Sequence, residues 1–342
     1  MHLPALVLAM TPADAADFLP AETTRRLLSM PFALRELPID LAAPMGPAAW
    51  GEALTAQSPE VLLSCWSTPP LPADLPLAAD GTGSLRYVCH LAGTVRRLVP
   101  RVLLERGLRV SNWGGSISRT VAEHALLLIL SSLRRHARWS VAMHREGAWK
   151  TRESVTESLF GRRVGIHGFG LIAQQLVGLL RPFGGPVSAY APGVAPARFE
   201  ELGVSVCDNA KALYAGSDVV VCLAPGTSAN FHVVDEPLLR SIPAGGVFVN
   251  ISRGVNVDEA ALLRVAREGQ LQIALDVYEH EPLDPASPLR GLPNVTLSPH
   301  LGGPTKDRRR DAGEFGLCNL ARYARGLALE AELSPAIYDL SS

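Results

Sequence analysis

The sequence predicts an α/β protein built from two doubly wound parallel sheets, and three observations support this fold class. Two series of short apolar runs alternate with helical stretches, one before residue 114 and one after residue 162. Uninterrupted apolar runs separated by helices are typical of parallel strands that are buried on both faces. The chain has 342 residues, whereas a single core rarely grows beyond about 250 to 300 residues. We therefore expect two domains.

The first series supplies the strands of one sheet. The apolar runs ALVLAM, VLLSCW, RYVCHL and LRVSNW predict strands at 5–10, 61–66, 86–91 and 108–113. Helices are expected near 22–33 and 94–106, and the proline-rich stretch 67–77 should be a loop.

A long helix is predicted over residues 118–146, and its segment 121–133 is apolar on nearly every face. A helix of this kind has to bury more than one side. Packing between domains or in a dimer would satisfy it, and an ordinary place in the core of one domain is the alternative.

The second series has six strand-like runs with intervening helices, which is what a dinucleotide-binding domain requires. These runs lie at 164–169, 187–192, 218–225, 246–252, 271–277 and 295–300. The tail, residues 306–329, predicts one further helix.

Composition argues against several classes of partner. Basic and acidic residues nearly balance, 32 against 33, so the chain lacks the positive field that nucleic acids and anionic membranes attract. The apolar run 125–130 is far shorter than the roughly 20 residues of a membrane span. The first lysine or arginine is Arg25, so the start of the chain does not resemble a signal peptide. The five cysteines are scattered, which favours buried thiols in a reducing compartment. We expect a cytoplasmic protein.

A glycine-containing loop follows the first strand of the second series. Gly168 permits a tight turn, and Gly170 allows a pyrophosphate to approach the backbone. Ala173 is small enough for the helix to pack closely on the strand. The backbone N–H groups of Leu171 and Ile172 begin that helix and would bind the pyrophosphate. The strand, turn and helix together predict a dinucleotide site, although the same glycines could form a turn without a ligand.

The next strand should end in an acid that binds the adenosine ribose, but Ala191 stands there. The nearest basic residue that follows is Arg198, which is too far along the chain to mark a 2′-phosphate site clearly. We expect NAD or NADP as the cofactor, with a small preference for NAD.

Three polar residues lie at the ends of later strands, where ligands bind in open α/β sheets. They are Arg253, Glu281 and His300. Arg253 and Glu281 are 28 residues apart, and Glu281 and His300 are 19 residues apart. Each alone could be a surface charge, a solvated acid or a loop histidine. Together, behind a phosphate-binding loop, they predict an active site. His280 has no third ligand at a suitable spacing, so we expect no metal site.

The ordered motifs resemble those of the D-isomer-specific 2-hydroxyacid dehydrogenase family, which includes phosphoglycerate, glyoxylate/hydroxypyruvate and D-lactate dehydrogenases. The resemblance runs nearly from end to end. The matching stretches are AGTV (92–95), NWGG (112–115), VAEH (121–124), Trp149, the glycine loop, CLAPGT (222–227), NISRG (250–254), DVYEHEP (276–282) and SPHLGG (298–303). It implies a flavodoxin-like substrate domain, at 1–114 with 303–342, and a Rossmann NAD(P)-binding domain at 115–302.

The resemblance also implies roles for individual residues. Arg253 would bind the substrate carboxylate, and His300 would be the acid/base group paired with Glu281. The backbone around Ala92, Gly93 and Thr94 would hold the carboxylate. The cofactor contacts would be Gly168, Gly170, Leu171, Ile172, Ala191, Ala224, Pro225, Asn230, Ile251, Ser252, Asp276 and Gly302. Three departures from the family pattern are Ala191, an Asn230 where threonine is frequent, and the lack of an aspartate after the AGTV stretch.

These roles predict a reaction in which NAD(P)H reduces a small 2-keto acid to a D-2-hydroxy acid, or the reverse. Arg253 would orient the substrate through two hydrogen bonds to its carboxylate. His300 would donate the proton, and a carboxylate at Glu281 would favour its charged form. The alternative is an NAD(H)-sensing, corepressor-like binding protein on the same fold, which turnover of a 2-keto acid would exclude. A formate dehydrogenase is disfavoured, because glutamine would then stand in place of Glu281. The family also implies a homodimer.

Overall fold

The computed structural model describes residues 3–37, 40–41, 46–152 and 154–340, and the chain divides into two compact units. The first unit comprises residues 1–117 with 304–342, and the second comprises residues 118–303. Among the described residues no helix is long and apolar enough to cross a membrane. The same residues contain no group of three His, Cys, Asp or Glu side chains arranged to hold a metal ion.

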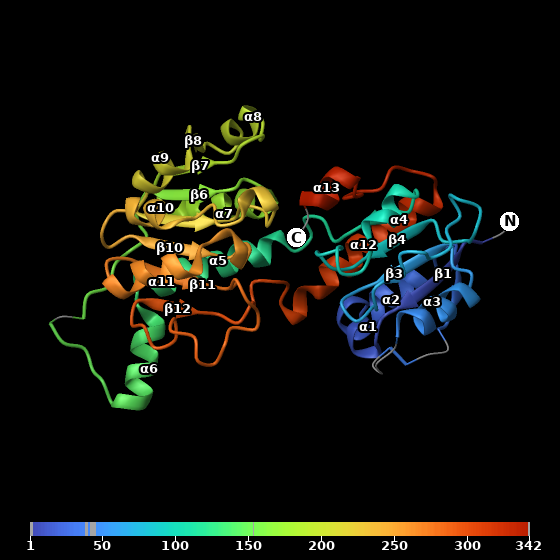
Figure 1. The fold of residues 1–342 in the computed structure, drawn as a ribbon, viewed down its shortest axis with the longest axis horizontal. Coiled ribbons are helices and arrows are strands. Elements are labelled where there is room, and N and C mark those ends of the chain that lie inside the picture. The colour runs from blue at the N-terminus through green and yellow to red at the C-terminus, as the bar shows by residue number, and fades with distance from the viewer. Residues whose placement is uncertain (1–2, 38–39, 42–45, 153, 341–342) are drawn as a thin grey trace. The chain divides into compact units, whose positions relative to one another are not determined.

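The first unit is built on a five-stranded parallel sheet (Figure 1). Its strands are β1 Ala5–Ala9, β2 Ala33–Arg35, β3 Val61–Ser64, β4 Tyr87–His90 and β5 Arg109–Ser111, in the order β2-β1-β3-β4-β5. Every pairing is parallel, so all five carboxyl ends lie at one edge of the sheet. The strand order reverses between β1 and β3, which makes that point the topological switch point of this unit.

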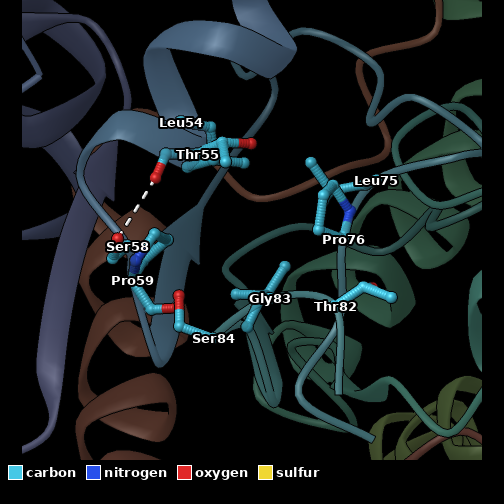
Figure 2. Close-up of a pocket in the computed structure, with 10 residues that line it drawn as sticks. Leu54, Thr55, Ser58, Pro59, Leu75, Pro76, Thr82, Gly83 and Ser84 are labelled. Carbon is cyan, nitrogen blue, oxygen red and sulfur yellow. Dashed lines mark hydrogen bonds between the residues drawn. The ribbon is translucent and has the colours of Figure 1, made fainter. Parts of the chain in front are cut away.

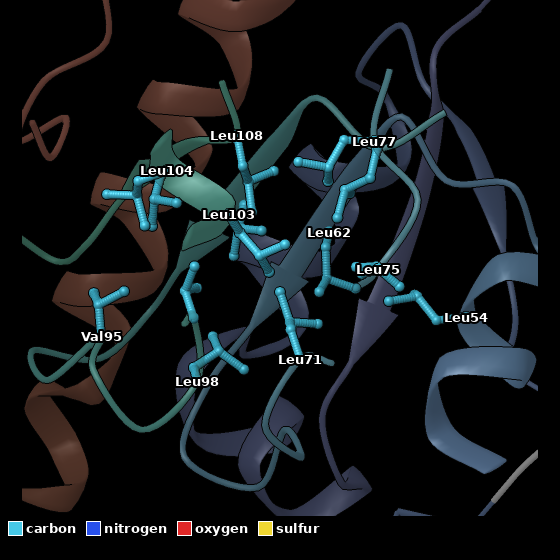
Figure 3. Close-up of a cluster of buried hydrophobic side chains, with 14 of the residues drawn as sticks. Leu54, Leu62, Leu71, Leu75, Leu77, Val95, Leu98, Leu103, Leu104 and Leu108 are labelled. Atoms are coloured by element: carbon cyan, nitrogen blue, oxygen red, sulfur yellow. The ribbon is translucent and has the colours of Figure 1, made fainter. Parts of the chain in front are cut away.

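Apolar side chains join this sheet to its helices. The helices are α1 Pro12–Phe18, α2 Ala21–Leu28, α3 Pro47–Ala56, α4 Arg101–Glu105, α12 Arg309–Ala324 and α13 Pro335–Leu340. One core cluster joins β3 to α3 and α4, through residues such as Leu62, Leu54 and Leu103 (Figure 3). Helix α12 packs against α1, α2 and β4. It approaches closely at Gly313, where a Cβ atom would lie 1.8 Å from the carbonyl oxygen of Phe18.

The second unit is built on a seven-stranded parallel sheet in the order β12-β11-β10-β9-β6-β7-β8. These strands are β6 Val164–His167, β7 Val187–Tyr190, β8 Ser205–Val206, β9 Val219–Cys222, β10 Val247–Asn250, β11 Gln272–Leu275 and β12 Val295–Leu297. The helices are α5 Ser118–Leu133, α6 His136–Glu146, α7 Leu171–Leu180, α8 Pro196–Glu200, α9 Ala210–Ala215, α10 Glu236–Ser241 and α11 Glu259–Glu268. The order reverses between β6 and β9. The predicted α/β fold with two parallel sheets is confirmed.

The predicted helix over 118–146 is wrong in one respect, because the structure contains two helices there. Helix α5 ends at Leu133, and Arg135 adopts a left-handed backbone with φ of 49°. The carbonyl oxygen of Leu133 accepts a hydrogen bond from the N–H of Glu157, 2.9 Å away. A contact from a distant part of the chain therefore takes the place of the next helical hydrogen bond. No glycine or proline marks this break in the sequence.

Three other expectations need correction. The helix expected at 94–106 is restricted to α4, because Pro100 has no N–H to donate and disfavours a helical backbone at the residue before it. The helix expected near 22–33 ends at Leu28, and β2 follows it. The tail helix ends at Ala324, shortly before Gly326 with φ of 66°. The short edge strand β8, Ser205–Val206, was not expected, since two exposed residues carry no apolar pattern.

Candidate active site

The glycine loop connects β6 to α7 in the second unit. Gly168 has φ of 95°, and a Cβ atom there would lie 2.6 Å from the backbone nitrogen of Ala224, which follows β9. Only glycine fits this position, where the backbone passes close to the neighbouring strand end. Gly170 is the N-cap of α7 and provides no side-chain cap, and no atom lies within 4 Å of where its Cβ would be. The start of α7 therefore has open space beside Gly170 and no side-chain cap, which suits a pyrophosphate.

Arg253 lies just beyond β10 and is half-buried. Its Nη1 donates a hydrogen bond to the carbonyl oxygen of Ser252 at 2.7 Å. Burial lowers the pKa of the Arg253 guanidinium, and the nearby charge of Glu281 opposes this shift. The next residue, Gly254, has no space for a side chain, since a Cβ would lie 1.8 Å from the carbonyl oxygen of Tyr278. This close approach brings the Arg253 loop against the segment that carries Glu281.

A buried polar network holds the Arg253 loop in place. Asn250 donates to the carbonyl oxygen of Arg253 at 3.1 Å and accepts from the hydroxyl of Ser252 at 2.9 Å. Asn256 donates to the carbonyl oxygen of Ala224 at 2.8 Å and to the hydroxyl of Ser252 at 3.2 Å. Asn256 thereby connects the loop after β10 to the loop after β9.

Glu281 and His300 form a direct pair. The His300 Nδ1 lies 2.6 Å from the Oε2 of Glu281, and the other carboxylate oxygen accepts from the N–H of Tyr278 at 3.1 Å. Both side chains remain partly exposed, and the pair uses only the Nδ1 nitrogen of His300. His300 has a left-handed backbone, with φ of 54°. Such a conformation costs on the order of 1 kcal/mol for a residue other than glycine and needs support from its surroundings.

Asp276 provides that support. Its Oδ1 accepts from the hydroxyl of Ser298 at 2.5 Å and from the N–H of Leu301 at 2.9 Å, and its Oδ2 accepts from the N–H of Gly302 at 2.8 Å. His124 Nε2 lies 3.2 Å from the same carboxylate. Burial alone would raise the pKa of Asp276, but these hydrogen bonds hold it below its usual value. The carboxylate thus clamps both ends of the loop that carries His300.

The predicted substrate loop, Ala92–Thr94, belongs to the first unit and follows β4. Its support comes from His90, whose Nδ1 lies 3.0 Å from the hydroxyl of Ser64 and whose ring also hydrogen-bonds to the backbone of Thr94. Burial lowers the pKa of His90 to about 4, so this imidazole is neutral at pH 7. Asn112 donates to the carbonyl oxygen of Gly93 at 3.0 Å.

The remaining predicted cofactor residues lie at the carboxyl edge of the second sheet. Ala191 directly follows β7 and is half-buried. Arg198, the first basic residue that follows Ala191 in the chain, is exposed and pairs with Glu201 at 3.1 Å. Asn230 donates to the carbonyl oxygen of Pro225 at 2.8 Å and so closes the loop after β9. Ile251 is buried. Gly302 lies so close to Asp276 that a Cβ atom there would be 2.6 Å from the carboxylate oxygen Oδ2.

Two cavities in the first unit lie at the amino ends of its strands, opposite the predicted substrate loop. One, of about 200 Å³, is lined by residues such as Thr55, Ser58 and Ser84 and contains no ionisable side chain (Figure 2). The other, of about 410 Å³, includes Glu60 and Arg86, which precede β3 and β4. Neither cavity contains a candidate residue.

Three supporting residues were not singled out from the sequence. His90 and Asn256 interrupt apolar runs in buried segments, and this interruption is the signal that could have indicated them. His124 lies in the VAEH stretch, where its spacing to Asp276 gives no sign of their contact.

Residues 126–302, which hold the glycine loop and the Arg253, Glu281 and His300 side chains, match the model of the D-isomer specific 2-hydroxyacid dehydrogenase, NAD binding domain. The chain belongs to the D-isomer-specific 2-hydroxyacid dehydrogenase family. The predicted enzyme class, an NAD(P)-dependent dehydrogenase of D-2-hydroxy acids, is confirmed, and the cofactor is NAD or NADP.

Individual relatives agree with this assignment. The glyoxylate/hydroxypyruvate reductase A HPR2 of Arabidopsis thaliana is 34% identical over 68% of this dehydrogenase and 72% of its own length. The D-3-phosphoglycerate dehydrogenase of Mycobacterium leprae is 36% identical over 67% of this chain, but the match spans only 42% of that protein. The crystal structure of a putative D-isomer specific 2-hydroxyacid dehydrogenase from Polaromonas covers 97% of this chain, with 25% identity, a TM-score of 0.75 and all of its own chain matched.

The hydrogen bonds to Asp276 predict a defined effect of Asp276→Asn on this dehydrogenase. The amide cannot accept hydrogen bonds at both of its ends, so the free energy of unfolding at pH 7 should fall by about 1–3 kcal/mol. Because the folded state lowers the pKa of Asp276, its contribution is full above about pH 4 and is lost as the pH falls further. Denaturant unfolding at pH 7 and pH 3.5 should show a smaller difference between variant and wild type at the lower pH. An equal difference at both values would contradict the clamp.

Proposed function

We propose that the protein reduces a small 2-keto acid to a D-2-hydroxy acid, with Arg253, Glu281 and His300 as its catalytic residues. The observation that carries this proposal is the 2.6 Å contact between His300 and Glu281, with Arg253 on the neighbouring strand end. An exposed imidazole paired to a carboxylate is suited to transfer a proton. A guanidinium beside it is suited to bind the carboxylate of the substrate.

Arg253 binds and orients the substrate. Its planar guanidinium can form two parallel hydrogen bonds to a carboxylate, and this holds the keto carbon in one position. Its partial burial strengthens that charge interaction, because less water screens it. In the first unit, the backbone of Ala92–Thr94 is the part to which the family resemblance assigns substrate binding.

His300 supplies the proton. When it is bound, the cofactor supplies the hydride, so negative charge develops on the keto oxygen. The imidazolium of His300 donates its proton to that oxygen through the nitrogen that does not face Glu281. Glu281 fixes the orientation of the ring through its contact with Nδ1. In the reverse direction the neutral ring accepts the proton of the hydroxyl group.

These roles predict the kinetics of two variants. His300→Ala should lower kcat by about 10²–10⁴-fold, because the proton donor is lost, with little change in cofactor affinity. Arg253→Ala should raise KM for the keto acid and also lower kcat, since both charge and orientation are lost. His232→Ala is a matched control, because His232 also pairs with a glutamate, Glu279, at 2.9 Å in the same unit. Turnover by His300→Ala close to that of wild type would show that the proton donor is another group.

The cofactor selectivity of the protein is proposed to be weak, with a small preference for NADH. Ala191 offers neither the hydrogen bonds nor the repulsion by which an acid selects NAD. Arg198, which could favour a 2′-phosphate, is engaged by Glu201.

Steady-state assays with NADH and NADPH should therefore differ by about 30-fold or less in kcat/KM, which is about 2 kcal/mol. Ala191→Asp should increase the preference for NADH, because the new carboxylate binds the ribose hydroxyls and repels a 2′-phosphate. A preference of the wild type above about a thousandfold would mean that other residues recognise the ribose.

The protein is also proposed to form a homodimer through α5, α6 and the segment after them. Helix α6 extends beyond the sheet of the second unit (Figure 1). Large apolar side chains along this part of the chain are more than half exposed, which is unusual for so many neighbours on a monomer. They are Leu127, Val141, Met143, Trp149, Val155 and Phe160. A second copy of the same surface would bury them around a two-fold axis.

Light scattering at micromolar concentration should therefore report about twice the 36.5 kDa mass of the chain. The double variant Leu127→Arg with Met143→Arg should reduce that mass toward one chain. The new positive charges of one subunit would then lie against those of the second subunit and repel them. Leu28→Arg, at an exposed apolar position of the first unit, serves as the control. A wild-type mass of one chain would exclude the dimer.

A further inference from the structure

The carboxyl edge of the first sheet carries two tryptophans beside the predicted substrate loop. Trp66 lies two residues beyond β3, and Trp113 lies two residues beyond β5. The loop Ala92–Thr94 follows β4, which lies between those two strands. Trp66 is also adjacent to the switch point between β1 and β3, where the N–H of Thr11 donates to the hydroxyl of Ser67 at 3.0 Å. Ligands of open α/β sheets bind beside such a point.

Trp66 is held from several sides and still remains exposed. Its ring meets the ring of Phe18 edge-on, with centroids 5.1 Å apart, and the ring of Trp113, with centroids 5.9 Å apart. The guanidinium carbon of Arg309 lies 5.0 Å from the ring centroid, and Asp17 binds that guanidinium at 2.6 Å. Nevertheless 48% of the residue is exposed. A fixed indole with half of its surface free is a rigid apolar platform.

Trp113 connects this platform to the substrate loop. A Cβ atom on Gly93 would lie 2.7 Å from the indole of Trp113, so the ring lies directly against the backbone of that glycine. The N–H of Trp113 also donates to the carbonyl oxygen of Ala92 at 3.4 Å. The apolar surface therefore continues from Trp66 to the loop that is proposed to hold the substrate carboxylate.

We propose that Trp66 and Trp113 bind the side chain of the substrate, and that the preferred substrates are arylpyruvates. These are 2-keto acids in which one methylene group joins the keto carbon to an aromatic ring. This inference rests on the function proposed above. An aromatic ring that packs against the exposed indole gains ring–ring attraction in addition to the apolar area that it buries. Glyoxylate has no side chain and gains none of this energy. The guanidinium that lies over the Trp66 ring, that of Arg309, is already bound to Asp17, which disfavours a phosphorylated side chain there.

Steady-state kinetics with phenylpyruvate, glyoxylate and a phosphorylated 2-keto acid test the proposal on the full chain with saturating cofactor. Phenylpyruvate should have a kcat/KM at least about tenfold higher than that of glyoxylate. Trp66→Ala should lower kcat/KM for phenylpyruvate about tenfold or more, mainly by raising KM, and should change that of glyoxylate less than about threefold. Trp66→Phe should restore much of the loss, since it keeps an aromatic ring and also guards against a folding defect. Leu28→Ala, at another exposed apolar position of the same unit, should leave kcat/KM unchanged for both phenylpyruvate and glyoxylate.

The outcomes separate this inference from the proposed function. Efficient reduction of glyoxylate or of the phosphorylated acid, with phenylpyruvate reduced no better, overturns the inference and leaves the proposed function intact. Equal losses for phenylpyruvate and glyoxylate in both Trp66 variants assign Trp66 a structural role only and also overturn it. A failure to reduce any 2-keto acid overturns both.

Discussion

The buried carboxylate of Asp276 determines where the histidine of the candidate site lies. It stands at the end of β11 and accepts hydrogen bonds from both sides of the loop that contains His300. His300 has a left-handed backbone that would not persist in a free loop. The position of its ring relative to Glu281 therefore depends on an acid that touches neither of them. Removing such a buried charge would cost more than removing a surface ion pair, because its partners would lose their acceptor.

Close contacts between backbone segments position the loop that carries Arg253. Gly254, after β10, lies against Tyr278, after β11, and Gly168, after β6, lies against Ala224, after β9. Two pairs of strand ends are therefore joined without any side chain between them. Asn250 and Asn256 complete the connection through hydrogen bonds to carbonyl groups. The side chains proposed as catalytic are thus carried by loops with many backbone contacts, which is what precise orientation of a substrate requires. The loops are rigid because their backbones have partners on both sides.

The sequence was informative wherever a pattern was local. The strand before Gly168, the helix after it and the polar residues at later strand ends follow from periodicity and turn chemistry, and the two parallel sheets follow from their order. The break after Leu133 could not be predicted, because it depends on the N–H of Glu157, which is distant in the sequence. Strands β2 and β8 were missed because they are short and lie at sheet edges, where few side chains are buried. The contacts of Asp276 with His124 and Ser298 join segments that no spacing rule relates.

Asn256 affects both the stability of the protein and the shape of the candidate active site. Its side chain is fully buried, and its Oδ1 has no hydrogen-bond donor among the residues that the structure describes. An unsatisfied buried acceptor costs about 1–3 kcal/mol, so this position holds the protein below the stability that its core could reach. An apolar residue of similar size would remove that cost, but it would also leave the carbonyl of Ala224 without its donor, which costs a comparable amount. It would also disconnect the loop after β9 from the loop that carries Arg253. Substitution of Asn256 therefore offers little gain in stability, and it would loosen the loop for which ligand binding is proposed.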